Sequence, residues 1–345
     1  MGPDHGVSRS GIELAEQALA GSRLSLARLL TQVENDTPAG RMGLDWLFPY
    51  AGRAHLIGVT GSPGTGKSSL VNRIALRYRN PQGGRPPQTV GVVAIDPTSP
   101  FSGGALLGDR VRMRDLAGDP GVFIRSMAAR GALGGLARQT AAAVQVLDAV
   151  GFEVILIETV GAGQSEVDIA CLAHTTLVVE APGLGDEIQA IKAGILEIAD
   201  ILVINKADRP GVENTERALR SMLEMGYPRR SPFHSAASSA ASPAAQQPAL
   251  EGWQPPVLKT VAIDGRGTDE LVVAIGRHLD YLKSHGEWQR RQYARLMNEL
   301  EVLIQGALVE RWRSGLPEDL YEEVVAQLCE RSISPYQALE KLVHE

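Results

Sequence analysis

The sequence predicts a doubly wound α/β domain built on a mainly parallel sheet. Short apolar runs with the pattern of strands recur from Ala54 onward, and helical stretches such as 71–78 separate several of them. Strands that are apolar on both faces are typical of a parallel sheet that helices cover on each side. The predicted strands are 55–60, 89–95, 121–126, 152–158, 175–181, 200–205 and 256–263.

Helical segments are expected before and after this domain. Apolar residues recur at helical spacing from about Gly11 to Glu34, and an apolar stripe at the same spacing runs from Leu296 to Leu308. The expected division is an N-terminal helical extension at 1–50, the α/β domain at 51–276 with a polar insert at about 231–256, and a C-terminal helical arm at 277–345.

Composition and charge argue against several classes of protein. The formal net charge is -6, which gives no electrostatic reason to expect nucleic-acid binding. The longest apolar runs are far shorter than the ~20 residues that span a bilayer, and the N-terminus lacks the apolar core of a signal peptide. The two cysteines lie far apart, which disfavours a disulfide framework or a C-x-x-C metal site. We therefore expect a cytoplasmic protein without nucleic-acid or membrane partners.

The stretch GVTGSPGTGKSSLVNR, which begins at Gly58, contains the spacing G-x-x-x-x-G-K-S between an apolar strand and an amphipathic helix. Glycines in this setting let backbone N–H groups approach phosphate oxygens at the helix N-terminus. Lys67 supplies a positive charge at the β- and γ-phosphates, and the Ser68 hydroxyl can ligate Mg²⁺. The predicted phosphate-binding residues are Gly61, Ser62, Pro63, Gly64, Thr65, Gly66, Lys67, Ser68 and Ser69. A nucleoside triphosphate is expected to bind here.

The segment DILVINKADRPG predicts that the base is guanine. Asn205, Lys206 and Asp208 form N-K-x-D at the end of a buried strand, where ligands bind in doubly wound sheets. The Asp208 carboxylate can accept hydrogen bonds from guanine N1–H and the 2-amino group, whereas adenine would leave it unpaired. Backbone contacts to guanine O6 are expected from Val261, Ala262 and Ile263.

Carboxylates that follow other strands are candidate metal ligands. Glu158 ends the strand VILIE and precedes Gly161 in the spacing of D-x-x-G, with Glu in place of Asp. Glu158 can hold Mg²⁺ directly or through water, and the Gly161 N–H is placed to bind the γ-phosphate. Asp96 at a strand end and Asp109 in the next loop are further candidates, although each also fits a helix cap or an exposed turn. The predicted metal ligands are Ser68, Asp96, Asp109 and Glu158.

Hydrolysis requires a positioned water, and the sequence lacks the usual residue for it. Lys67 and Mg²⁺ neutralise charge on the transferring phosphoryl group while water attacks in line. Small GTPases have a Gln directly after the glycine of D-x-x-G, where this chain has Ala162; Gln164 would serve only after the loop rearranges. We expect slow intrinsic hydrolysis that a partner accelerates. The predicted catalytic residues at this point are Lys67, Glu158 and Gln164.

These motifs together resemble the MeaB/ArgK family of P-loop GTPases, which associate with methylmalonyl-CoA mutase. The matching stretches are GSPGTGKSS, DPTSPFSGGALLGDRVRM, RGALGGLA, ETVGAGQSE, APGLGDEIQAIKAGILEIADILVINKAD and SPYQALEKLV. The resemblance implies a homodimeric GTPase that serves a coenzyme B12-dependent acyl-CoA mutase. Such a protein gates adenosylcobalamin delivery, protects or reactivates the mutase, and hydrolyses GTP faster when the mutase is bound.

The resemblance also implies roles for two further regions. The family uses the loop matching GLGDEIQAIK as a switch that faces the mutase, which makes Asp186, Glu187 and Lys192 candidates for coupling. Lys192 is also a candidate to complete the active site, with a solvated helix lysine as an equal alternative. Family members dimerise through C-terminal helical arms, and the stripe from Leu296 to Leu308 is expected to pack on a second subunit or, alternatively, on its own domain.

Other functions stay open at this point. A nickel metallochaperone GTPase has a related domain, but the seven histidines are scattered and neither cysteine has a ligand-like neighbour. An ATP-dependent kinase or transport ATPase is disfavoured by N-K-x-D. A direct cobalamin carrier would need D-x-H-x-x-G, and Arg53 stands where the Asp should precede His55. Cobalamin is therefore expected to be handled through the partner, and the choice among acyl-CoA mutases is left undefined.

Overall fold

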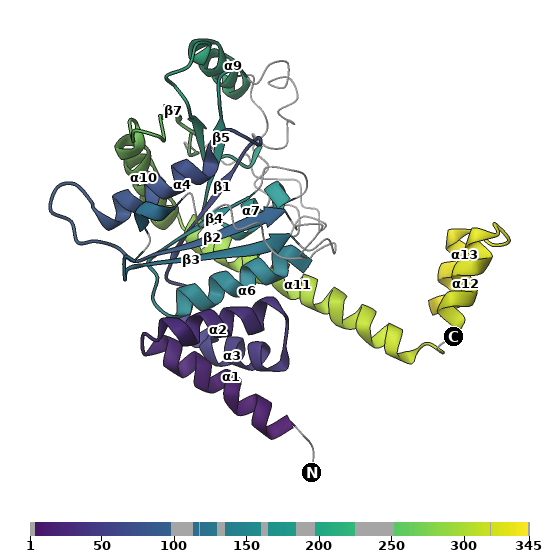
Figure 1. The fold of residues 1–345 in the computed structure, drawn as a ribbon. Coiled ribbons are helices and arrows are strands. Elements are labelled where there is room, and N and C mark those ends of the chain that lie inside the picture. Colours follow the sequence, from purple (N-terminus) through teal and green to yellow (C-terminus); the bar gives the residue numbers. More distant parts are fainter. Residues whose placement is uncertain are drawn as a thin grey trace. The chain divides into compact units, whose positions relative to one another are not determined.

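The computed structural model describes residues 4–97, 113–116, 118–129, 135–159, 165–183, 197–224, 252–317 and 319–343 (Figure 1). The chain forms two compact units, Met1–Arg295 and Leu296–Glu345. Only the last part of the predicted polar insert, 252–256, falls within the described residues.

A seven-stranded sheet, counted over the described residues, forms the centre of the first unit, with the strand order β3-β2-β4-β1-β5-β6-β7. Every neighbouring pair is parallel, and the central strand β1 pairs with β4 and β5. The strands are β1 (His55–Thr60), β2 (Val90–Pro97), β3 (Val122–Ala129), β4 (Val154–Glu158), β5 (Thr175–Glu180), β6 (Ile201–Ile204) and β7 (Val257–Lys259). The predicted fold class is confirmed.

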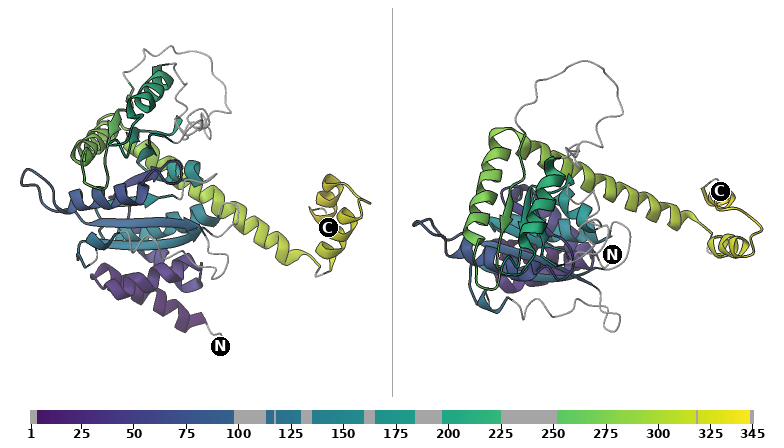
Figure 2. Two further views of the ribbon diagram at one scale, coloured as in Figure 1. Left: turned by 45° about the horizontal axis from the view of Figure 1, so that its top comes forward. Right: turned by 90° about the horizontal axis from the view of Figure 1, so that it is seen from above.

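Helices cover both faces of the sheet because alternate strand residues point to opposite sides. Ile57 and Leu156 pack with the helices of one face, whereas their neighbours Leu56 and Ile155 pack with those of the other. The first face carries α4 (Lys67–Arg79) and α10 (Thr268–Ser284), together with the short η2 (Arg114–Leu116). The second carries α6 (Gly135–Ala149), α7 (Ser165–Leu172) and α9 (Val212–Glu224), as Figure 2 shows from two further directions.

Three N-terminal helices form an additional layer over α6 (Figure 1). They are α1 (Asp4–Leu19), α2 (Arg23–Glu34) and α3 (Pro38–Leu47), followed by the 3-10 turn η1 (Phe48–Tyr50). The predicted helical stretch from about Gly11 to Glu34 is interrupted, because Gly21 takes a φ of 95° and the Ser22 side chain caps α2. Arg125 of β3 forms an ion pair with Glu34, which ties this layer to the sheet edge.

The second unit is helical. Helix α11 (Glu287–Gly315) begins in the first unit and continues into the second, which also contains α12 (Leu320–Cys329) and α13 (Pro335–Val343). Trp312 Nε1 donates a 2.6 Å hydrogen bond to the Leu342 carbonyl, and Val324 and Ala338 are buried. The apolar stripe of α11 is exposed, with Leu300 at 50% and Leu308 at 60%. No helix in the described residues is long and apolar enough to cross a membrane.

Candidate nucleotide-binding site

The glycine-rich loop follows the central strand β1 and leads directly into α4. Gly61 has a φ of 135°, and a Cβ there would lie 2.0 Å from the Val179 carbonyl oxygen. Gly64 and Gly66 also take positive φ values, 78° and 92°, and Gly66 is the N-cap of α4. These conformations strain any L side chain. The loop therefore needs its glycines for backbone shape, as the motif requires for a phosphate cradle.

Lys67 is folded back over this loop. Its side chain is buried, and Nζ donates to the carbonyl oxygens of Gly61 at 2.7 Å and Ser62 at 3.0 Å. A buried ammonium requires several polar partners because desolvation of a charge is costly. The Lys67 ammonium is thus held next to the glycine-rich loop by carbonyl oxygens of that loop.

Ser68 and Glu158 bring two oxygen ligands together beneath the loop. Ser68 Oγ donates a 2.6 Å hydrogen bond to Glu158 Oε1, and both side chains are buried. The sheet register fixes Glu158, the last residue of β4, between Val59 of β1 and Ala94 of β2. Hard oxygen donors of this kind suit Mg²⁺. The two residues expected to act on one metal are therefore neighbours.

The other predicted ligands and switch residues are only partly described. The Asp96 backbone lies in β2, opposite Ala128 and two residues beyond the partner of Glu158; its side chain is outside the described part. The residues wholly outside the described part are Asp109, Gly161, Gln164, Asp186, Glu187 and Lys192.

Asn205 connects the phosphate loop to the predicted base loops. Its Nδ2 donates to the Thr65 carbonyl at 2.8 Å, while its Oδ1 accepts from the Ala262 N–H at 3.0 Å and from Thr260 Oγ1 at 3.2 Å. Lys206 Nζ donates to the Gly64 carbonyl at 2.5 Å. Three segments far apart in the sequence are thereby joined into one framework.

The atoms expected to read the base are available at the edge of this framework. Asp208 is exposed, and its carboxylate has no protein partner within the described residues. Ala262 is buried, and its N–H is already donated to Asn205. The next residue, Ile263, is 79% exposed, and its N–H has no acceptor within the described residues. The backbone donor free to meet a ligand in this loop is therefore Ile263 N–H.

Sequence reasoning missed Arg73, which lies on α4 and contacts the same loop. Arg73 Nε donates to the Ala262 carbonyl at 2.9 Å, and Nη2 donates to the Ile263 carbonyl at 2.5 Å. No motif marks this residue, and only its position on the helix that follows the glycine-rich loop hints at a role.

A second buried polar cluster was also missed, at the amino ends of β1, β5 and β6. Thr175 Oγ1 lies 2.7 Å from His55 Nε2 and 2.9 Å from His278 Nδ1. Asp200 accepts two 2.8 Å hydrogen bonds from the Arg291 guanidinium, which also donates to a backbone carbonyl at 2.6 Å. We call these five residues, together with His174, the amino-edge cluster.

Burial and ion pairing together set the charges of the amino-edge cluster. Burial lowers the pKa of His55 to about 3, with smaller contributions from nearby positive groups. It also holds the pKa of His174 well below its ordinary value, and this ring packs 3.9 Å, centroid to centroid, from Trp288. Burial would raise the pKa of Asp200, but Arg291 outweighs it and keeps that pKa below its usual range. Two neutral histidines thus lie beside a charged Asp–Arg pair.

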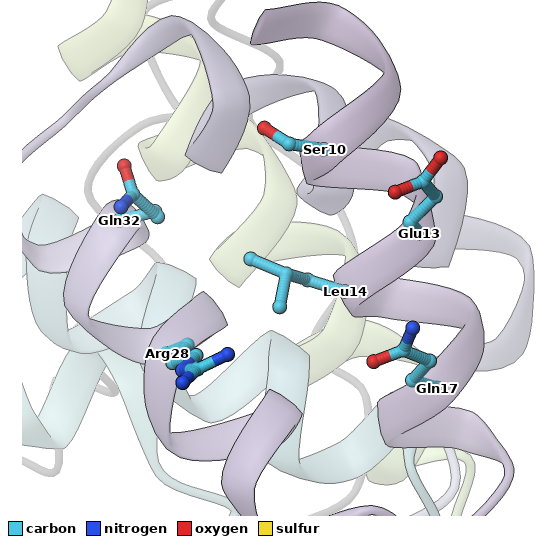
Figure 3. A pocket seen from close by; sticks show the side chains of 6 residues that line it. All are labelled: Ser10, Glu13, Leu14, Gln17, Arg28 and Gln32. Carbon is cyan, nitrogen blue, oxygen red and sulfur yellow. The ribbon is translucent and has the colours of Figure 1, made fainter.

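A surface pocket of about 570 Å³ lies between α1 and α2 (Figure 3). The lining residues are Ser10, Glu13, Leu14, Gln17, Arg28 and Gln32. None of these residues belongs to the nucleotide-binding framework. This pocket is separate from the predicted site.

The glycine-rich loop, the Ser68–Glu158 pair and the Val261–Ile263 loop lie at the carboxyl ends of the strands, and Asn205 bonds to both loops. This connected framework places the chain among the P-loop GTPases. A family profile described as "Methylmalonyl Co-A mutase-associated GTPase MeaB" matches residues 26–316. The chain belongs to the MeaB family.

Relatives support this assignment along most of the chain. A homologue from Pyrococcus abyssi, whose name assigns it to the GTPases, is 41% identical over 333 residues, covering 96% of each protein. The GTPase ArgK of Escherichia coli is 35% identical over 293 residues, covering 82% of each. A crystal structure named as a LAO/AO transport system kinase superposes with a TM-score of 0.65 at 26% identity, covering 100% of this chain and 98% of that one.

Proposed function

We propose that this GTPase serves a coenzyme B12-dependent acyl-CoA mutase, methylmalonyl-CoA mutase or a close relative. In this role it gates adenosylcobalamin delivery and protects or reactivates the mutase, handling cobalamin through its partner. The observation that carries the proposal is the match over 26–316 to a family described as mutase-associated. The matched range includes every residue of the candidate nucleotide site.

The phosphate loop is proposed to bind the triphosphate through its backbone. Residues Gly61–Ser69 form this loop and the first turn of α4. All except Pro63 carry a backbone N–H, and the helix dipole favours anions at this end of α4. Lys67 now donates to two loop carbonyls, and phosphate oxygens are stronger acceptors for its charge. We expect Lys67 to exchange these bonds for contacts with the β- and γ-phosphates.

Ser68 and Glu158 are proposed to hold Mg²⁺, with Asp96 and Asp109 as further candidates. The 2.6 Å Ser68–Glu158 contact fits this role, since both side chains are buried and supply oxygen atoms. Mg²⁺, when bound, supplies positive charge against the phosphate oxygens. Within the protein, the fixed register of β4 keeps Glu158 in reach of Ser68.

The base is proposed to lie between the Asp208 turn and the Val261–Ile263 loop. Asp208 accepts from guanine N1–H and the 2-amino group, and Ile263 N–H donates to O6. Asn205 and Lys206 act by holding these loops to the phosphate cradle. These contacts hold the proposed base-binding loops next to the loop that is proposed to bind the triphosphate.

Slow hydrolysis and activation by the partner complete the proposal. Gly161 is proposed to bind the γ-phosphate and Gln164 to position water. Asp186, Glu187 and Lys192 are proposed to couple the site to the mutase, with Lys192 completing the active site. Their support is the motif spacing and the family membership.

The C-terminal arm is proposed to form a homodimer. The stripe from Leu296 to Leu308 exposes apolar side chains on α11, a helix of 29 residues with no buried side chain. Exposed apolar stripes at helical spacing are typical of helix–helix interfaces. We retain the division at 1–50, 51–276 and 277–345 as part of this proposal.

The test combines the purified chain with methylmalonyl-CoA mutase lacking its cofactor. GTP hydrolysis is measured with and without mutase, and adenosylcobalamin loading is followed spectroscopically with GTP, GDP or a non-hydrolysable analogue. We expect faster hydrolysis with mutase and loading that depends on the nucleotide, both lost in Lys67→Met. Unchanged hydrolysis and loading with this and related acyl-CoA mutases would contradict the proposal.

A further inference from the structure

Arg73 of α4 holds the Val261–Ile263 loop through its guanidinium. Its guanidinium bonds to two successive carbonyls, those of Ala262 and Ile263, and its stem passes Gly265. Within the described residues no carboxylate pairs with Arg73. Because a guanidinium is a rigid planar fork, two bonds to adjacent carbonyls define the orientation of both peptide units.

One of those peptide units contains the free donor of the base loop. The Ala262 carbonyl and the Ile263 N–H belong to the same trans peptide, in which they point in opposite directions. Holding the carbonyl toward α4 therefore directs the N–H away from α4. A positively charged donor on the carbonyl also polarises the peptide and makes the N–H a stronger donor.

The same loop is held from its other side by Asn205. Asn205 Oδ1 accepts the Ala262 N–H, so the two peptide units that flank Ala262 are each fixed by one side chain. Asn205 extends from the end of β6 and also bonds to the phosphate loop, whereas Arg73 lies on the helix that this loop begins. Both anchors are thus tied to the phosphate cradle.

We propose that Arg73 is a positioning residue for guanine recognition: it orients and polarises the Ile263 N–H that donates to guanine O6. This inference rests on the proposed base site. It predicts that Arg73 strengthens recognition of the guanine 6-oxygen and affects neither phosphate binding nor the chemical step.

The test measures dissociation constants by calorimetry for three Mg²⁺-bound diphosphates. GDP carries O6, the 2-aminopurine riboside diphosphate lacks it, and ADP has an amino group there. In Arg73→Met we expect GDP binding to weaken about tenfold, the typical effect of one lost hydrogen bond with charge assistance. We expect the other two to change less than about twofold and kcat at saturating GTP to stay unchanged, since no O6 contact is lost.

Two further variants separate positioning from general damage. Arg77→Met removes a charge one turn along α4, where Arg77 pairs with Asp269 at 3.0 Å instead of with the base loop, and it should bind GDP as the parent does. Arg73→Lys keeps the charge without the planar fork and should weaken GDP selectively but less than Arg73→Met. If Arg73→Met does not fold, as judged by thermal unfolding without nucleotide, Arg73→Lys decides.

The proposal is overturned if the decisive variant keeps its GDP affinity within about twofold of the parent, because such a change is well below the effect of one hydrogen bond. It is also overturned if the variant loses affinity for all three ligands equally. A failure of the base site itself looks different. In that case the unmodified protein would bind ADP as tightly as GDP.

Discussion

At the carboxyl ends of the central strands, charged side chains bond mainly to backbone carbonyls, whereas at the amino ends they bond to one another. Lys67, Lys206 and Arg73 each donate to loop carbonyls beside the nucleotide site. In the amino-edge cluster, Asp200 and Arg291 form a two-bond ion pair.

The difference reflects what each edge must do. Lys67 donates to neutral carbonyls and should gain by moving to phosphate, because a charged acceptor binds its ammonium more strongly. Arg73 and Lys206 instead keep their carbonyl contacts and hold the loops in place. A buried ion pair has no such alternative, and separating it leaves an uncompensated charge. Lys67 at the carboxyl edge can therefore exchange its hydrogen-bond partners, whereas the Asp200–Arg291 pair at the amino edge stays together.

The largest effect is expected from Lys67. Lys67→Met should lower kcat/KM for GTP about 10³-fold, because a preorganised charge at the transferring phosphoryl group is lost. Steady-state hydrolysis measures it, and far-ultraviolet circular dichroism checks the fold. Retention of a tenth or more of the parent activity would contradict the role given to Lys67.

Substitutions at the amino edge should lower the free energy of unfolding and leave kcat unchanged. Arg291→Met leaves the Asp200 carboxylate buried without its main partner and should reduce the free energy of unfolding by about 3–5 kcal/mol. Urea denaturation measures the loss, while kcat of the folded protein should not change. The neighbouring Arg290→Met breaks only an exposed pair with Glu287 and should cost less than about 1 kcal/mol. Equal losses in the two variants would disprove the distinction.

Asp208 tests the exchangeable edge at the base. Asp208→Asn replaces an acceptor by an amide that can donate, and it should weaken GTP binding about 10²-fold while favouring xanthosine triphosphate, which has a carbonyl at the 2-position. Competition binding measures both affinities. Asp264→Asn alters an exposed carboxylate paired with Arg266 and serves as the control. A parallel loss in both variants would count against Asp208 as the base-reading group.

Lowering the pH should reduce the free energy of unfolding through His55 at the amino edge, by less than the loss expected for Arg291→Met. His55 has a folded pKa of about 3 and an ordinary value of 6.5, and between these values only the unfolded chain binds the proton. Its contribution is therefore complete above about pH 6.5 and falls as the pH drops toward 3, with about 2 kcal/mol lost at pH 5. His55→Gln should remove this part of the loss in urea denaturation at pH 7.5 and 5, whereas the exposed His285→Gln should not. An unchanged pH dependence in His55→Gln would contradict the assignment.

The two edges also differed in how far the sequence revealed them. The phosphate loop and N-K-x-D are contiguous stretches whose chemistry requires fixed spacing, and their predicted proximity follows from parallel strands ending at one edge. The amino-edge cluster combines residues from β1, α10, α11 and the starts of β5 and β6, and no local pattern relates His55 to Arg291. Only the folded packing brings them together.

Smaller departures have equally local causes. The seven strands were predicted, because their apolar runs are distinct. The break at Gly21 was missed because helical spacing continues on both sides of it. The Ala262 backbone was expected to contact guanine O6, but its N–H donates a hydrogen bond to Asn205 Oδ1. Sequence spacing alone does not specify such a side-chain contact.

The most direct measurement is calorimetric titration of the purified, folded chain with GTP, GDP and ATP in the presence of Mg²⁺. Guanine nucleotides should bind at least about 10²-fold more tightly than ATP, because only guanine satisfies Asp208. Absence of binding heat with GTP, or equal affinity for ATP, would contradict the proposal that Lys67, Asn205 and Asp208 belong to one nucleotide site.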